Sequence, residues 1–131
     1  MIPYRNTFSK EERLCSRTII QDLFSRREAH TALIFPLAAT WRFQALPSAS
    51  PAQVLFSIPK KKFKKAHDRN RIRRQLRSAY RLQKNLLYEP LNSQRLQCAV
   101  VITYIAQEKL PYTQIENACN SLLQKITESI R

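Results

Sequence analysis

The most informative absence in this sequence of 131 residues is glycine, which does not occur at all. Loops that hold the phosphates of ATP or of dinucleotide cofactors need glycine, because a side chain would block the approach of the backbone to the phosphate. The chain therefore lacks the motif for ATP- or NAD-dependent chemistry. We expect no nucleotide cofactor.

Cysteine is also scarce. The residues Cys15, Cys98 and Cys119 are odd in number, lie far apart and form no C-x-x-C pair. This spacing indicates neither a disulfide framework nor a zinc site. We expect three free thiols that pack as small apolar residues, and no metal site in the protein.

Long apolar runs are missing as well. No stretch approaches the roughly 18 uninterrupted apolar residues needed to span a bilayer. The segment Met1–Asn6 has no apolar core of a signal peptide. These two features predict a soluble protein of the cytoplasm.

Acidic residues are few. Nine Asp and Glu against 23 Lys and Arg give a net charge of +14, and such an excess implies a polyanionic partner. The acids are scattered, so they form neither an acid–base pair nor a carboxylate cluster for metal ions. His67 is a conceivable general base, because neighbouring cations favour its neutral form. We expect no catalytic residue in the protein itself.

What is present is an alternation of helix and strand signals. Ser16 precedes apolar residues at helical spacing and predicts a helix at about 16–26. Residues 31–43 are rich in strand formers and are interrupted at Pro36, which predicts two short strands. Further strands are predicted at 54–58 and, from a nearly continuous apolar run, at 98–105.

Two more helices are expected. The longer begins at Asp68, a good N-cap residue, and runs to about Tyr88, just before Pro90 stops it. The last begins near Thr113, which can form a capping box with Glu116. The whole chain then forms one α+β domain with helices packed on a sheet.

The basic residues concentrate in residues 60–77, where ten cations stand against one acid. On a helical wheel of about 100° per residue, the helix that follows has two faces. One face is predicted to be buried: Ile72, Leu76, Ala79, Tyr80, Gln83, Leu86 and Leu87. The other is predicted to face solvent: Asn70, Arg73, Arg74, Arg77, Arg81 and Lys84.

This second face could simply be solvated, but two features favour phosphate binding. The acids that would balance a solvated helix are missing, and arginine presents a planar fork of donors that suits phosphate. Like charges at this spacing repel one another in the free protein. A polyanion that releases its counterions on binding makes the arrangement favourable, so we expect a nucleic acid along this face.

The stretch from residue 58 to residue 77 carries a longer pattern. A strand ends in Lys-Lys, a basic connector follows, and Arg-Asn-Arg opens a helix that continues with Ile, paired basic residues, Leu and Arg. It resembles the signature of the bacterial ribonuclease P protein family, and looser similarity runs from about Phe8 to the last helix. The resemblance implies a two-layer αβββαβα sandwich with a four-stranded mixed sheet and a left-handed strand–helix–strand crossover. General handedness rules would predict the opposite hand.

The resemblance also implies a function. In this family an RNA removes the 5′ leader of precursor tRNA with the help of magnesium ions, and the protein binds both the catalytic RNA and the leader. The implied partners are thus ribonuclease P RNA and precursor tRNA. Carried over by position, the residues that dock on the RNA are Arg69, Asn70, Arg71, Arg73, Arg74 and Arg77. The basic connector and the helix face add to the predicted RNA-binding set Lys60, Lys61, Lys64, Lys65 and Arg81.

In the family, a cleft between the sheet and the first helix takes the leader. By position, Phe24 matches one of two aromatic residues on that helix, and Ile20 stands where the other usually is. Trp41 is an aromatic candidate on the cleft-facing strand, although Phe24 and Trp41 could equally well be core residues. Two other positions depart from the family pattern: Leu55 replaces a common glycine, and Thr103 precedes Tyr104 where a cation is frequent.

Two other classes share parts of this pattern. A structural RNA-binding protein of the ribosomal type would have similar size and charge, and a DNA-binding protein could carry a basic helix. Against the second, the basic helix lies between strands and does not follow a short turn from another helix. The RNA that co-purifies with the protein would separate ribonuclease P from the ribosomal alternative.

Overall fold

The computed structural model describes residues 7–25 and 28–130, and its centre is a four-stranded sheet. The strands lie in the order β1-β2-β4-β3. β2 is antiparallel to β1 and β4, whereas β3 runs parallel to β4. Their bounds are β1 (His30–Ile34), β2 (Leu37–Phe43), β3 (Ala52–Ser57) and β4 (Cys98–Tyr104).

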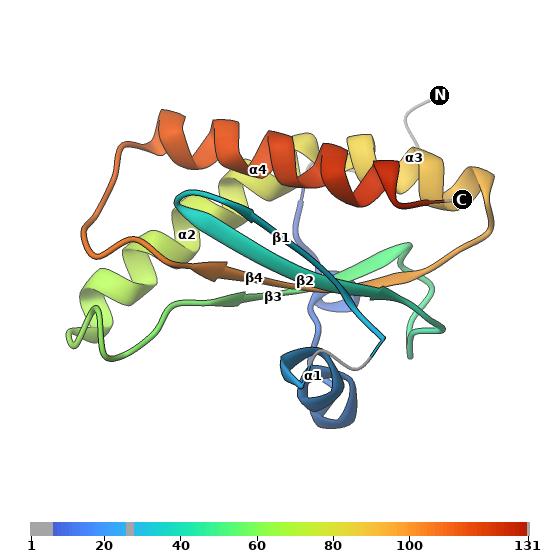
Figure 1. Ribbon diagram of the computed structural model, residues 1–131, viewed down its shortest axis with the longest axis horizontal. Coiled ribbons are helices and arrows are strands. Elements are labelled where there is room, and N and C mark those ends of the chain that lie inside the picture. The colour runs from blue at the N-terminus through green and yellow to red at the C-terminus, as the bar shows by residue number, and fades with distance from the viewer. Residues whose placement is uncertain (1–6, 26–27, 131) are drawn as a thin grey trace.

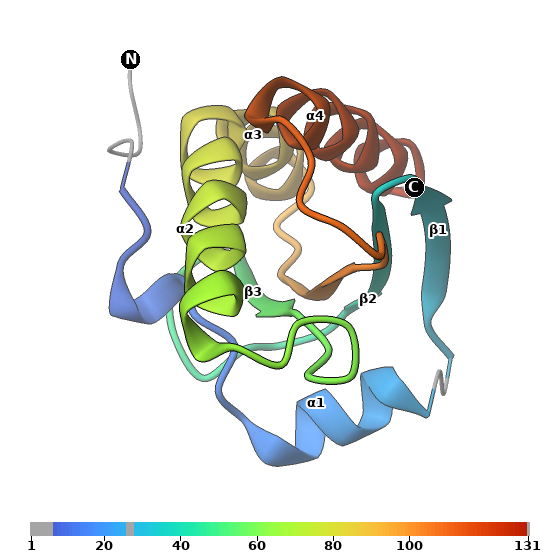
Figure 2. The same cartoon turned by 90° about the vertical axis from the view of Figure 1, so that its left-hand side faces the viewer.

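Helices lie on both faces of this sheet (Figure 1). One face is covered by α2 (Ala66–Gln83), α3 (Asn85–Ser93) and α4 (Tyr112–Glu128), and α1 (Arg17–Phe24) lies on the other. A short 3-10 helix, η1 (Lys10–Glu12), precedes α1. The connection from β3 through α2 and α3 to β4 is left-handed (Figure 2), as the family resemblance implies.

Strand alternation divides the apolar residues between two cores. The larger lies under α2, α3 and α4 and includes Val100 and Ile102 of β4. The smaller lies under α1 and joins Ile19 and Leu23 to Val101. Because α1 is short, it leaves part of its sheet face open, and this opening becomes a groove described below.

Most of the predicted elements are confirmed. The α+β class is correct, and Pro36 separates β1 from β2. Ser16 is the N-cap of α1, where its Oγ accepts from the backbone N–H of Ile19 at 3.3 Å. Every predicted strand is present within two residues of its expected bounds.

The start of the long basic helix is different from the prediction. α2 has Lys65 at its N-cap, so Asp68 lies in the first turn and does not cap the helix. The Asp68 carboxylate instead pairs with the ammonium of Lys109 across 2.9 Å. An acid in the first turn still complements the helix dipole, which is why the sequence marks this region as a helix start.

The predicted stop at Pro90 is also wrong. α2 ends at Gln83, and α3 follows after one residue and continues through Pro90. Proline has no N–H to donate to the Leu86 carbonyl one turn earlier. The hydroxyl of Thr127 in α4 donates to that carbonyl at 3.3 Å, so tertiary packing compensates for the proline.

Three smaller expectations also fail. α4 begins at Tyr112 with proline at its N-cap, so the predicted capping box at Thr113 does not form. Leu86 was predicted to be buried from a helical wheel that assumed one continuous helix. It is 46% exposed, because α2 ends at Gln83 and Leu86 belongs to the next helix. Cys98 and Cys119 are buried free thiols as predicted, but Cys15 is exposed.

Lys84 is the largest departure, since it was assigned to the solvent face and is 2% exposed. Its ammonium lies 2.7 Å from a carboxylate oxygen of Glu12 and also donates to the Thr7 carbonyl. The Tyr88 hydroxyl donates to the same Glu12 oxygen at 2.6 Å. These buried contacts of Glu12 with Lys84 and Tyr88 hold η1 against the junction of α2 and α3.

Among the helices in the described ranges, none is long and apolar enough to cross a membrane.

Candidate nucleic-acid interface

The polar residues of α2 leave the helix on two sides. Ile72, Leu76, Ala79 and Tyr80 form its buried face, as predicted. Arg73 and Arg77 lie in a groove beside η1, whereas Arg71 and Arg74 lie in a pocket beside α4. The single solvent face of the helical wheel is therefore two separate cationic surfaces on the folded protein.

The groove beside η1 has a volume of about 180 Å³ and an aromatic ring in its wall. The guanidinium carbons of Arg13 and Arg77 each lie 5.9 Å from the centroid of the Phe8 ring, which is a cation–π arrangement. Arg73 donates to the side-chain oxygen of Asn70 at 2.9 Å, which orients that guanidinium. The groove thus holds three arginines, two of which lie over one aromatic ring.

The electrostatics of this groove favour an anion. Burial lowers the pKa of Arg77, and the positive charges of Arg13 and Arg73 lower it further. Its Nε is buried and has no hydrogen-bond partner among the residues that the structure describes. A phosphate placed here would offset the mutual repulsion and accept from the free donor.

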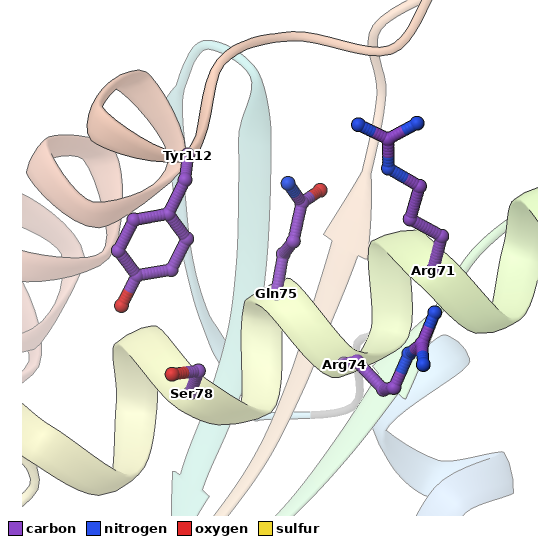
Figure 3. Close-up of a pocket in the computed structure, with 5 residues that line it drawn as sticks. All are labelled: Arg71, Arg74, Gln75, Ser78 and Tyr112. Carbon is purple, nitrogen blue, oxygen red and sulfur yellow. The ribbon is translucent and has the colours of Figure 1, made fainter.

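The second surface is a pocket of about 410 Å³ between α2 and the start of α4. Arg71, Arg74, Gln75, Ser78 and Tyr112 line it, and Figure 3 shows Arg71 and Gln75 projecting from α2 to the side of the Tyr112 ring. None of these lining residues is an acid. The sequence contained no local signal for Tyr112, which reaches the pocket from a distant helix.

The basic connector before α2 is held by its own hydrogen bonds. Arg69 donates to the carbonyls of Phe63 at 2.8 Å and Lys64 at 2.9 Å, and Lys62 donates to the Ile105 carbonyl. Arg69 therefore shapes the connector as well as carrying charge. The remaining predicted lysines of the segment are exposed: Lys60, Lys61, Lys64 and Lys65.

On the opposite face of the sheet, α1 and strands β2 and β4 enclose a groove of about 230 Å³. Phe24 lies at its edge with 57% of its surface exposed. The rest of the wall is apolar or hydroxyl-bearing and uncharged: Leu23, Ala38, Thr40, Val101, Thr103 and Ile105. Ile20 is half-buried and packs against the small core beneath α1.

The assignment of Trp41 to this groove is wrong. Trp41 is 3% exposed and belongs to the larger core, on the sheet face away from α1. Its indole N–H donates to the Ser129 hydroxyl at 2.9 Å, and its ring stacks on His30 with centroids 5.6 Å apart. Side chains alternate along a strand, so Ala38 and Thr40 are the β2 residues that face the groove.

Three acids of the described chain form ion pairs. Glu12 binds Lys84, Asp22 binds Arg42 and Asp68 binds Lys109. No group of three or more acidic, histidine or cysteine side chains that could hold a metal ion occurs within residues 7–25 and 28–130. His67 is exposed at the start of α2, in the cationic region.

A family model described as Ribonuclease P matches residues 8–127 of the chain. The chain belongs to this family. A curated ribonuclease P protein component of Porphyromonas gingivalis is 30% identical over 122 residues, which cover 93% of this chain and 88% of the relative. A ribonuclease P protein component is the accessory subunit of an RNA-based endoribonuclease, in which RNA carries out the cleavage. RNA binding, partnership with ribonuclease P RNA and a role in tRNA processing follow for this chain.

Solved structures support the same fold. The ribonuclease P protein of Staphylococcus aureus aligns with a TM-score of 0.65 at 16% identity, over 92% of this chain and 98% of that one. The protein from Thermotoga maritima aligns with a TM-score of 0.68 at 17% identity, over 87% of this chain and 96% of that one. The shared architecture is the four-stranded mixed sheet with its helices.

Proposed function

We propose that this ribonuclease P protein docks on its RNA through α2 and the basic connector, and holds the leader of precursor tRNA in the groove beneath α1. The observation that carries the proposal is the separation of chemistry between the two faces of the sheet. Arginines gather around α2, whereas the described residues lining the α1 groove are uncharged.

The α2 side fits a folded RNA. Its cations lie along one helix and its connector, so they can contact successive phosphates and release counterions. Asn70 adds an amide that orients Arg73. The docking set we propose is the predicted one, with Phe8 and Arg13 added from the segments on either side of η1.

The α1 groove fits a single strand. Bases of unpaired RNA stack on exposed aromatic rings and hydrogen-bond to hydroxyls. Phe24 offers such a ring, and Thr40 and Thr103 offer hydroxyls. We include Ile20 as a wall residue of α1 behind Phe24.

The protein's contribution to the reaction is positional in this proposal. It would keep the leader near the RNA and lower the repulsion between RNA and substrate, while magnesium ions required for cleavage are held by the RNA. Such a ribonucleoprotein would act in the cytoplasm, where precursor tRNA is processed.

The decisive experiment reconstitutes the protein with its cognate ribonuclease P RNA. Binding should be compared for precursor tRNA, for a precursor with the leader shortened to one nucleotide, and for mature tRNA. We expect the protein to tighten binding of the full precursor most and of mature tRNA least. Equal tightening of all three substrates would contradict a leader groove, and cleavage by RNA-free protein would contradict RNA catalysis.

A further inference from the structure

The pocket between α2 and α4 is an open hollow on the surface with the volume of a ligand site. Its volume of about 410 Å³ falls within the range of roughly 300 to 1,000 Å³ typical of small-molecule pockets. Its walls come from the outer side of α2 and from Tyr112 at the first position of α4. In Figure 3 the Tyr112 ring lies over the turn of α2 that carries Ser78, and Gln75 and Arg71 extend beside it.

The polar groups of this pocket have no partners in the described chain. The hydroxyl of Tyr112 is buried and makes no hydrogen bond. The side chains of Arg71, Arg74, Gln75 and Ser78 likewise make no hydrogen bond or ion pair with the described residues. Buried polar groups in proteins are normally hydrogen-bonded, so the unpaired Tyr112 hydroxyl indicates a missing partner. Arg71 and Arg74 are exposed, so their donors are open to a ligand that arrives from solvent.

The charge of the pocket selects an anion. Arg71 and Arg74 are three residues apart and therefore adjacent on the helix surface, where their like charges repel. Asp68 lies one turn before Arg71 and could have balanced it, but Lys109 occupies that carboxylate at 2.9 Å. The pocket thus keeps two uncompensated guanidinium groups.

The pocket offers more kinds of contact than a phosphate ion alone could use. Guanidinium groups bind phosphate through paired hydrogen bonds. The Tyr112 ring supplies a stacking surface, and the Gln75 amide can both donate to and accept from a base edge. The ligand that matches these three contacts has a phosphate, a flat ring and a polar ring edge, and a nucleotide has all three.

From this geometry we propose that the pocket binds one unstacked nucleotide of ribonuclease P RNA. Its phosphate lies between Arg71 and Arg74, and its base lies against Tyr112 within reach of Gln75 and Ser78. This rests on the proposed function, because it takes the catalytic RNA as the partner of α2. The α1 groove lies on the other face of the sheet, so the leader in that groove does not reach this pocket.

The test uses the full protein, its cognate RNA and chemical probing of unpaired bases. Tyr112→Leu removes the stacking surface, and Arg71→Ala with Arg74→Ala removes the phosphate contacts. Tyr112→Phe keeps the ring and loses only the hydroxyl. Lys125→Ala is the matched control, because it removes an exposed cation of α4 outside the pocket.

We expect wild-type protein to protect one specific base that is reactive in free RNA. Tyr112→Leu should abolish this protection and weaken RNA binding by roughly 5- to 100-fold. Tyr112→Phe should keep the protection and weaken binding by roughly 2- to 10-fold. The arginine pair should flatten the slope of log affinity against log salt by about one to two units, and Lys125→Ala by much less.

The outcomes separate this proposal from the proposed function. If wild-type protein does not bind the RNA, the proposed function fails. If wild-type protein binds but Tyr112→Leu protects the same bases with the same affinity, the nucleotide pocket alone is wrong. If the base whose protection depends on Tyr112 lies in precursor tRNA and none lies in the catalytic RNA, the nucleotide belongs to the substrate and the choice of catalytic RNA is overturned. Unfolding curves of Tyr112→Phe and the arginine pair show whether the variants remain folded.

Discussion

The two faces of the sheet differ in how they can bind RNA. Around α2, the arginines lie in the groove beside η1 and in the pocket beside α4. The nearby acid Asp68 forms an ion pair with Lys109 and does not balance them. Beneath α1, the described wall is apolar or hydroxyl-bearing, and Arg42 beside it is tied to Asp22 at 3.3 Å. Binding on the first face should therefore depend on salt, and binding on the second on stacking and shape.

Under the proposed function, this difference between the faces lets one small protein bind two RNA molecules. A salt-dependent surface binds any closely spaced phosphates, so it suits a large partner that stays bound. A neutral groove with an aromatic edge has little attraction for duplex RNA, because the bases of a duplex are not free to stack on it. The two sites should be separable by mutation.

The largest effect should come from Glu12→Ala. This change leaves the Lys84 ammonium, 2% exposed, without its carboxylate, and breaking a buried ion pair from one side costs about 3–5 kcal/mol of folding free energy. Urea unfolding measures this loss, and Glu11→Ala is the control because Glu11 is an exposed neighbour. The contacts of Glu12 hold η1, so RNA docking should weaken in molecules that remain folded. A loss no larger than that of the control would mean that the pair does not hold η1.

The same pair predicts a pH dependence. Burial raises the pKa of Glu12, but hydrogen bonds from Lys84, Ser9 and Tyr88 outweigh burial, so the net pKa lies below its ordinary value of 4.5. A lowered pKa in the fold adds stability above the unfolded-state pKa, and that stability is lost as pH falls through the folded-state pKa. Wild-type stability should therefore fall below about pH 4.5, and Glu12→Ala should lack this part of the fall.

The next effect concerns the α2 face alone. Arg73→Ala combined with Arg77→Ala should weaken binding of the catalytic RNA by on the order of 100-fold at moderate salt and flatten the salt slope by about one to two units. Folding stability should change little, because like charges are removed from one helix surface. Binding titrations at several salt concentrations measure both quantities.

The contrast for this prediction is the buried face of the same helix. Ile72→Ala and Leu76→Ala empty core positions and should cost about 2–5 kcal/mol each in folding, with RNA affinity per folded molecule unchanged. If the arginine pair unfolded the protein and left that affinity intact, α2 would not be the docking surface.

A smaller effect is expected in the groove beneath α1. Phe24→Leu should weaken precursor tRNA binding to the holoenzyme by about 1–3 kcal/mol, the usual contribution of a stacked base, and leave mature tRNA binding unchanged. Fluorescence titration with the two tRNAs measures the difference. Trp41→Leu is the matched comparison, since this buried ring should affect unfolding and not the leader. Equal loss for both tRNAs in Phe24→Leu would remove Phe24 from the leader site.

These residues also show how far the sequence can be read. The strands, the position of α2 and its arginines follow from local patterns: apolar runs, strand-breaking prolines and the Arg-Asn-Arg motif. The burial of Lys84 could not be predicted, because its partner Glu12 lies 72 residues away and no periodicity links them. Tyr112 joins Ser78 in one pocket for a similar reason, since the fold brings together the outer side of α2 and the start of α4.

The prediction that Trp41 lies in the leader groove was wrong for a different reason. The alternation of β2 correctly separates Trp41 from Thr40, but alternation does not say which face meets α1. That choice depends on where the helices pack after folding. The large Trp41 ring lies under α4, where its indole N–H donates to the Ser129 hydroxyl. On the other face of the sheet, the smaller side chains of Ala38 and Thr40 leave room for the groove.

The smallest effect should follow from loss of the bridge between Arg42 and Asp22, which joins β2 to α1 beside the groove. The two side chains are 20% and 33% exposed, so solvent screens the pair and its removal should cost no more than about 1 kcal/mol of folding free energy. Arg42→Gln and Asp22→Asn should nevertheless each weaken precursor tRNA binding a few-fold, because α1 would be held less firmly against the sheet. Both variants should bind the catalytic RNA as the wild type does. If Arg42→Gln alone weakened that binding and flattened its salt slope, Arg42 would be a phosphate contact, and the division between a cationic face and a neutral face would not hold.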